Sequence, residues 1–131
     1  MPLAELAWDE HNPGLTVSPI TAREEAARTA LSQPHVYAVG THMGCGCPFA
    51  FEPDWNQPTA ADLAEFQDNR PNFVQLNEYL EVALRAGASV ELYNAWDFWL
   101  EPLDRNDLGA SDLMAEHFVF QDRQHYTLVS G

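Results

Sequence analysis

Two cysteines and a histidine stand close together in the segment Thr41–Phe49, T-H-M-G-C-G-C-P-F. Thiolate and imidazole are preferred zinc ligands, so His42, Cys45 and Cys47 could supply three of the usual four. The two glycines between them can adopt backbone conformations that let a short loop wrap its side chains around one point. The segment therefore predicts a zinc site. The fourth ligand would be Asp97, His117, His125 or a water molecule.

The same Cys-Gly-Cys loop has other readings. A disulfide between Cys45 and Cys47 would close a small, strained ring, and strained pairs are the labile, redox-active kind. A nucleophilic cysteine beside His42 is a further hypothesis, although no local catalytic signature accompanies it. The loop could also be purely structural, because free cysteine packs like a small apolar side chain. All of these readings stay open on the sequence alone.

A second group with chemical potential follows an expected strand, in Tyr93-Asn-Ala-Trp-Asp-Phe-Trp99. Large rings beside short polar side chains can form a pocket with an apolar wall and a few polar anchors. Aromatic residues at this density are also typical of an ordinary core. We expect small-ligand contacts from Asn94, Trp96, Asp97 and Trp99.

Two strands must position both groups. His35–Thr41 and Ser89–Trp96 are rich in β-branched and aromatic residues, which predicts strands. The helix expected between them favours a parallel crossover within one sheet. Both the cysteine loop and the segment after Trp96 would then leave the same carboxyl edge, where ligands of open α/β sheets bind.

Helix boundaries are marked by local chemistry. Thr21 and Glu24 form a capping-box pattern that predicts a helix to about Ser32. Thr59 is placed to cap a second helix, which Pro71 should break or kink near Arg70. An apolar stripe follows the break, and Gly87 stands where a left-handed helix C-cap belongs.

The C-terminal third predicts an acidic loop and a hairpin. Residues 101–111 read as the loop, while 116–121 and 125–129 read as strands around a turn at Asp122-Arg123. His117 and His125 would face one another across this hairpin as secondary metal ligands. The fold class expected is α/β or α+β, in two layers, with a small mixed sheet of about four strands and helices on one face. Residues 1–131 form one domain, with 1–17 as an N-terminal arm and 18–131 as the folded core.

Charge narrows the functional classes. Six Lys+Arg against twenty Asp+Glu give a net charge of −14, and all six basic residues are arginine. Such a surface repels nucleic-acid phosphates and anionic membranes, so we expect neither partner. The first residues show no secretory signal pattern, and two cysteines make no disulfide framework, which predicts a cytoplasmic protein.

The strand ending in G-T-H, the loop Met43-G-C-G-C-Pro-Phe49 and the later E-L-Y-N-A-W resemble segments of small uncharacterised bacterial proteins with a G-C-G-C loop and an E-L-Y strand. The resemblance covers about a sixth of the chain. It implies that loop and strand belong together, and it transfers no activity or catalytic residue.

Two functions compete on these observations. The first is a small acidic domain that binds a metal, with zinc as the cofactor, or a small ligand through its His-x2-Cys-x-Cys loop. The second is an acidic interaction module, of the inhibitor or immunity type, that binds a basic protein and uses the Cys-Gly-Cys loop only structurally. Binding is favoured over catalysis, no catalytic residue is assigned, and a homo-oligomer is compatible with either function.

Overall fold

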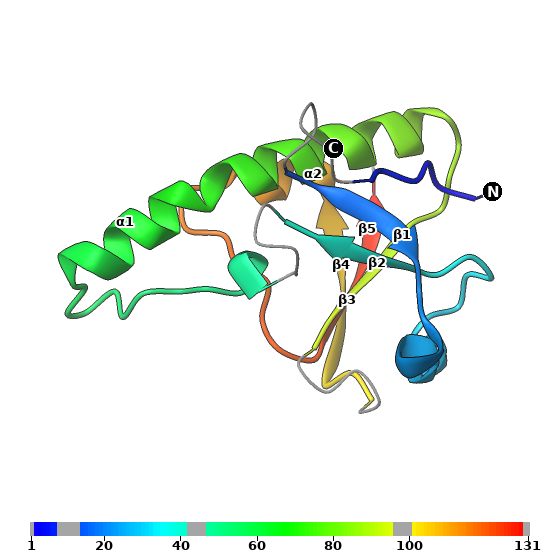
Figure 1. Ribbon diagram of the computed structural model, residues 1–131, viewed down its shortest axis with the longest axis horizontal. Helices are drawn as coiled ribbons and strands as arrows, with labels where there is room; N and C mark the ends of the chain where they lie inside the picture. The colour runs from blue at the N-terminus through cyan, green and yellow to red at the C-terminus, as the bar shows by residue number, and fades with distance from the viewer. Residues whose placement is uncertain (1, 8–13, 42–46, 96–100, 130–131) are drawn as a thin grey trace.

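A computed structural model describes residues 2–7, 14–41, 47–95 and 101–129 of the chain (Figure 1). The described residues form an α+β fold with two α-helices, three short 3₁₀ segments (η) and five strands. The elements are β1 Thr16–Pro19, η1 Ala22–Ala30, β2 Tyr37–Gly40, η2 Cys47–Phe49, α1 Ala60–Asp68, α2 Arg70–Arg85, β3 Glu91–Asn94, β4 Asp104–Gly109, η3 Ala110–Met114 and β5 Gln124–Val129.

The strands form two separate sheets. β1 and β2 pair antiparallel, with Val17 opposite Val39. The second sheet has the order β3-β5-β4, in which β5 runs antiparallel to β3 and parallel to β4. Of the two predicted classes, α/β or α+β, the structure has α+β, and the predicted mixed sheet is confirmed. This mixed sheet has three strands instead of about four, because β1 and β2 form a separate sheet.

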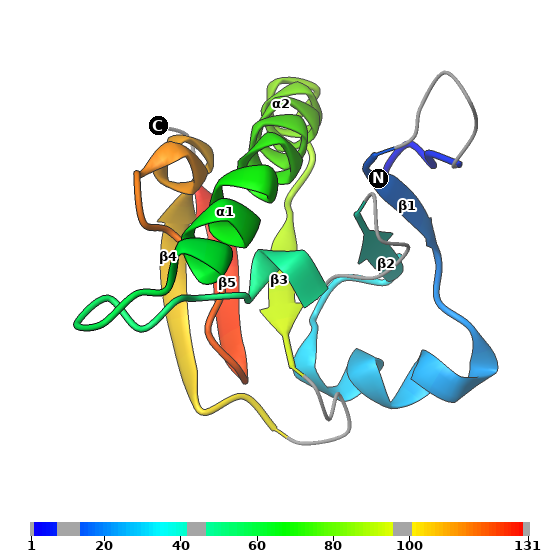
Figure 2. The ribbon, with the colours of Figure 1, turned by 60° about the vertical axis from the view of Figure 1, so that its left-hand side comes forward.

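The predicted parallel crossover between the first two strands is wrong. The expected strands at 35–41 and 89–96 exist in shortened form as β2 and β3, but they belong to different sheets. β2 takes β1 as its partner, and β3 takes β5. Figure 2 shows the two sheets side by side, with α2 at the top and η1 at the bottom.

Two predictions for the C-terminal third are also wrong. The expected acidic loop contains β4, whose residues Asp104–Asp107 are all exposed because this strand forms an edge of the sheet. The expected hairpin is absent, since 116–121 is not a strand and β5 pairs with β3 and β4 instead. The turn at Asp122-Arg123 does precede β5, and Arg123 adopts a φ of 57° there.

Local signals placed the helices correctly. The Thr59 hydroxyl accepts a hydrogen bond from the Asp62 N–H at 3.1 Å, which caps α1. Pro71 stands at the start of α2, directly after the break at Asn69. Gly87 follows α2 with a φ of 91°, a conformation that glycine adopts without steric cost. The first predicted helix is present as the 3₁₀ segment η1, and the Glu24 carboxylate accepts hydrogen bonds from the Thr21 N–H and hydroxyl, both at 3.0 Å.

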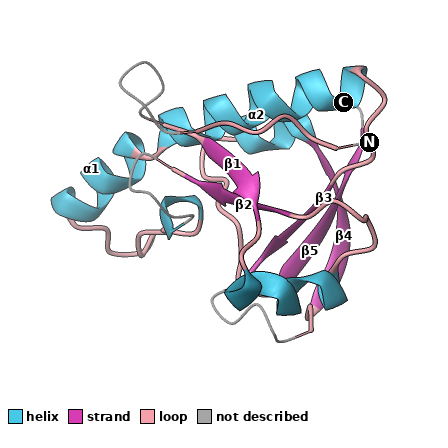
Figure 3. Cartoon of the chain, turned by 45° about the vertical axis from the view of Figure 1, so that its right-hand side comes forward, coloured by secondary structure: helices cyan, strands magenta, loops and turns pink. Residues whose placement is uncertain are grey.

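One buried cluster joins α2 to both sheets. It contains Leu76 and Leu80 from α2, Val17 from β1 and Leu128 from β5, together with Val90, which directly precedes β3. Figure 3 shows α2 across the top of the molecule, with the strands of both sheets below it. An aromatic group closes one end, where the Phe49 ring lies edge-on against Phe73 and Phe120 at centroid distances of 5.2 and 5.9 Å. The core therefore depends on α2 as the element that both sheets share.

Truncation of Leu80 tests this dependence. Leu80 is 1% exposed, so Leu80→Ala should lower the free energy of unfolding by about 2–5 kcal/mol, because a buried leucine leaves a cavity when truncated. Val82 lies on the same helix and is 63% exposed, so Val82→Ala should change it by less than about 0.5 kcal/mol. Urea denaturation of both variants measures the difference, and equal effects would contradict the assigned packing.

Candidate functional site

A cavity of about 320 Å³ lies between the two sheets. Its walls are β2, β3, η1 and the loop between η1 and β2, and α2 contributes Leu76 and Leu80. Phe49 and Phe120 of the aromatic group also line it. The surface is mainly apolar, with a small number of carboxylate, amide and phenol groups. Pockets of this size and composition are typical of small-molecule sites.

The cavity follows from the way the strands pair. Val17 exchanges backbone hydrogen bonds with Leu6 at 2.9 and 3.0 Å, so its opposite residue Val39 directs its backbone groups away from β1. The carbonyls of Val90, directly before β3, and of Asn94 at its end accept hydrogen bonds from the N–H groups of Leu128 and Arg123 at 2.9 and 2.6 Å. Alternation then turns the backbone groups of Glu91 away from β5. Two strand edges thus border the same gap instead of pairing with each other.

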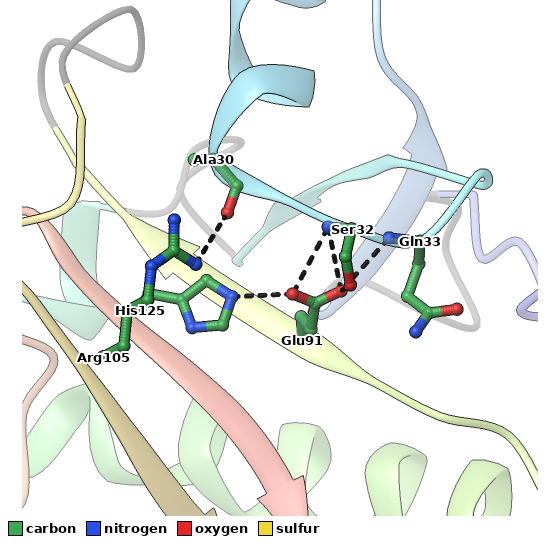
Figure 4. Close-up of polar contacts among 6 residues, drawn as sticks. All are labelled: Ala30, Ser32, Gln33, Glu91, Arg105 and His125. Carbon is green, nitrogen blue, oxygen red and sulfur yellow. Dashed lines mark hydrogen bonds and ion pairs between the residues drawn. The ribbon is translucent and has the colours of Figure 1, made fainter.

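A buried carboxylate ties the two sides of the gap together. Glu91 of β3 accepts hydrogen bonds from the Ser32 hydroxyl at 2.6 Å and from the Ser32 and Gln33 N–H groups, both at 3.1 Å (Figure 4). Its other oxygen lies 2.8 Å from Nε2 of His125 in β5. The Glu91 and His125 side chains are 9% and 4% exposed. The segment that leads from η1 to β2 is therefore fastened to the C-terminal sheet.

Burial and hydrogen bonding compete over the charge of Glu91. Desolvation alone would raise the pKa of this carboxyl group, but hydrogen bonds from Ser32 and His125 outweigh it and hold the pKa below its ordinary value. The carboxylate therefore stays ionised at neutral pH inside a nearly closed site.

All three strands of the second sheet contribute to this fastening. Glu91, His125 and Arg105 come from β3, β5 and β4, and Arg105 stands opposite His125 in the parallel register. One Arg105 nitrogen donates to the carbonyl of Ala30, the last residue of η1, at 3.4 Å. Figure 4 shows Glu91 and Arg105 reaching this backbone segment, while the His125 ring contacts the Glu91 carboxylate.

The N-terminal residues cover another side of the cavity. Leu3 lines it, and the Leu3 N–H donates to the Tyr37 hydroxyl at 3.2 Å. The Tyr79 hydroxyl of α2 donates to the carbonyl of Ala4. Both tyrosines belong to the cavity wall, so these contacts fix their rings as well as the N-terminal segment.

The structure brings only some of the predicted site residues to this cavity. Asn94 lines it and donates from its amide to the Gln121 carbonyl at 3.0 Å. The remaining predicted ligand contacts lie outside the described residues, as do two of the predicted metal ligands. These are Trp96, Asp97 and Trp99, and His42 and Cys45. Cys47 begins η2, but its side chain is outside the described part as well.

The expected pairing of His117 with His125 is wrong. His117 stacks on the Trp55 ring at a centroid distance of 3.9 Å, whereas His125 is buried beside Glu91. The predicted hairpin that would have set them face to face does not form. The same-edge composite site also fails, because β2 and β3 belong to different sheets.

Across the described ranges, no group of three or more His, Cys, Asp or Glu side chains is placed to hold a metal ion. The zinc site at His42, Cys45 and Cys47 stays a prediction. In the same ranges, no helix combines the length and the apolar character that a membrane crossing needs.

Sequence reasoning missed Glu91 and Ser32. In the sequence, Val90 and Leu92 alternate with Glu91 and Tyr93, which indicates that the face with Glu91 is the more solvated one. The structure instead buries the Glu91 side chain under the residues that follow η1. The available signal was weak, namely one carboxylate and one histidine on two expected strands. Nothing in the spacing indicated that Ser32, 59 residues away, would be the partner.

Comparisons with protein-family models, with curated proteins and with solved structures found no match to this chain. The fold and the cavity define an α+β domain with a pocket between its two sheets.

The pH dependence of stability tests the role of Glu91. Because its pKa is lower in the folded chain, its contribution is fully present above the ordinary value of 4.5 and is lost as the pH falls through the folded value. Glu91→Gln should reduce the free energy of unfolding at neutral pH by about 1–3 kcal/mol, since buried donors lose a charged partner. It should also flatten the acid limb of the stability profile.

The exposed Glu78 of α2 provides the matched control. Glu78→Gln makes the same chemical change, and urea denaturation from neutral to acidic pH should give it a profile close to that of the unchanged protein. A Glu91→Gln profile that also matches the unchanged protein would rule out the fastening role.

Proposed function

We propose that this protein binds a small, largely apolar molecule in the cavity between its two sheets. The observation that carries the proposal is the cavity itself, about 320 Å³ bordered by the edges of β2 and β3. This volume lies within the roughly 300–1,000 Å³ range of small-molecule sites. A few fixed polar groups on a mostly apolar wall can orient a ligand while apolar burial supplies affinity.

One of the ligand-contact residues predicted from the sequence supports the proposal. Asn94 belongs to the wall, and the chain continues from Ala95 into the predicted contacts Trp96, Asp97 and Trp99. We propose a ligand-binding protein and not an enzyme. A cytoplasmic location is also part of the proposal.

The zinc site and the basic protein partner remain predictions from the sequence. Neither is needed for the cavity to bind a small molecule. The proposal therefore rests on the cavity alone and leaves the Cys-Gly-Cys loop free to be structural.

A neutral fluorophore tests the proposal directly. N-phenyl-1-naphthylamine brightens in apolar surroundings, and it should titrate the full chain to saturation with one site. Ala38 of β2 lines the cavity, so Ala38→Trp should fill part of the volume and weaken binding at least tenfold, about 1.4 kcal/mol.

Val74 of α2 is 37% exposed and lies outside the cavity wall, so Val74→Trp adds the same ring elsewhere as a control. It should bind the fluorophore like the unchanged protein. Circular dichroism melting verifies that both variants are folded. The absence of saturable binding, or an equal loss in both variants, would refute the proposal.

A further inference from the structure

We infer that the ligand of the inter-sheet cavity is a small apolar amine, bound as its ammonium ion, and that carboxylate and phosphate ligands are excluded. This inference rests on the proposed function and adds the chemical class of the ligand. It follows from the charges and rings that the cavity wall presents.

The described wall carries two carboxylates and one imidazole. Glu24 of η1 and Glu91 of β3 line the cavity, and His35 is the basic side chain among the described wall residues. The chain contains no lysine, and no arginine belongs to the described wall. Arg105 donates to the Ala30 carbonyl. Acidic groups therefore outnumber basic ones in the described wall.

The two carboxylates act in different ways. Glu91 already accepts hydrogen bonds from Ser32, Gln33 and His125. It therefore attracts a cationic ligand through its charge and not through a hydrogen bond of its own. Glu24 is half-buried, and the Thr21 N–H and hydroxyl both donate to the same Glu24 oxygen. Its second oxygen is the better candidate for a direct hydrogen bond to an ammonium group.

Aromatic faces add a second attraction for a cation. Tyr37, Tyr79 and Tyr93 all belong to the wall, and a cation within about 6 Å of such a ring is attracted to the ring face. Contacts with Leu3 and Ala4 hold the first two rings in place. Burial raises the pKa of Tyr93, while Arg123 and Arg105 nearby oppose that rise. The ring of Tyr93 should therefore attract a cation less than the other two.

An anion would meet the opposite situation. It would lose its hydration in a mostly apolar space near two carboxylates, with no lysine or arginine among the described wall residues to offset that loss. A neutral apolar molecule would lose no ionic hydration and would not be repelled by the carboxylates, but it would gain no electrostatic attraction. The expected order of affinity is therefore ammonium, then neutral, then anion.

Three naphthalene compounds of similar size test this order. They are 1-naphthylmethylamine, 1-naphthalenemethanol and 1-naphthoate, each measured by displacement of N-phenyl-1-naphthylamine from the full chain at about pH 8. The amine should bind at least tenfold more tightly than the alcohol, and the naphthoate at least tenfold more weakly.

A matched pair of variants separates the cavity from the overall charge of −14. Glu24→Gln should lower the ratio of amine to alcohol affinity at least threefold. Glu78→Gln changes the net charge equally on an exposed part of α2, and it should leave this ratio unchanged.

The possible results distinguish the two proposals. Equal affinities for amine and alcohol, tighter binding of naphthoate, or equal responses of the two variants would overturn the inference and leave small-ligand binding intact. Failure of all three compounds and of the fluorophore to bind would remove the proposed function together with the inference.

Discussion

The arrangement depends on one ionised carboxylate that is almost fully removed from water. Glu91 remains charged because Ser32, Gln33 and His125 surround it with donors, and the cost of leaving these donors unpaired keeps the segment after η1 in place. Among the described residues, the two sheets share no strand pairing. This network is therefore a polar link between the two sides, while α2 and its apolar side chains provide the common core.

The cavity is a consequence of that link. Strands that came close enough to pair would have made one continuous sheet with no space between β2 and β3. Here the carboxylate and α2 hold the two edges near each other without pairing them, and the Phe49, Phe73 and Phe120 rings pack the end of the space. Because the gap is held from both sides, the cavity can keep its shape before a ligand enters. Such preorganisation lowers the entropic cost of binding.

The distribution of the few arginines explains the electrostatic character of the site. Arg28, Arg105 and Arg123 donate to the backbone carbonyls of Pro34, Ala30 and Glu101. Arg70 lies between the Phe66 and Phe73 rings, at 3.9 and 4.1 Å from their centroids, and burial lowers its pKa. These four cations fasten loops or pack against rings, and none of the four belongs to the described cavity wall.

The sequence by itself determined the features that depend on neighbours in the chain. Thr59, Pro71 and Gly87 set the ends of the helices through capping, ring geometry and a left-handed backbone, which act within a few residues. The composition and the strand patterns also narrowed the fold to α/β or α+β with a small mixed sheet. Only the tertiary structure decided which strands pair, that the polar run at 104–109 is an edge strand, and that Glu91 meets Ser32. The physical reason is that strand pairing and carboxylate burial are settled by contacts between residues far apart in sequence, which no local pattern of side chains encodes.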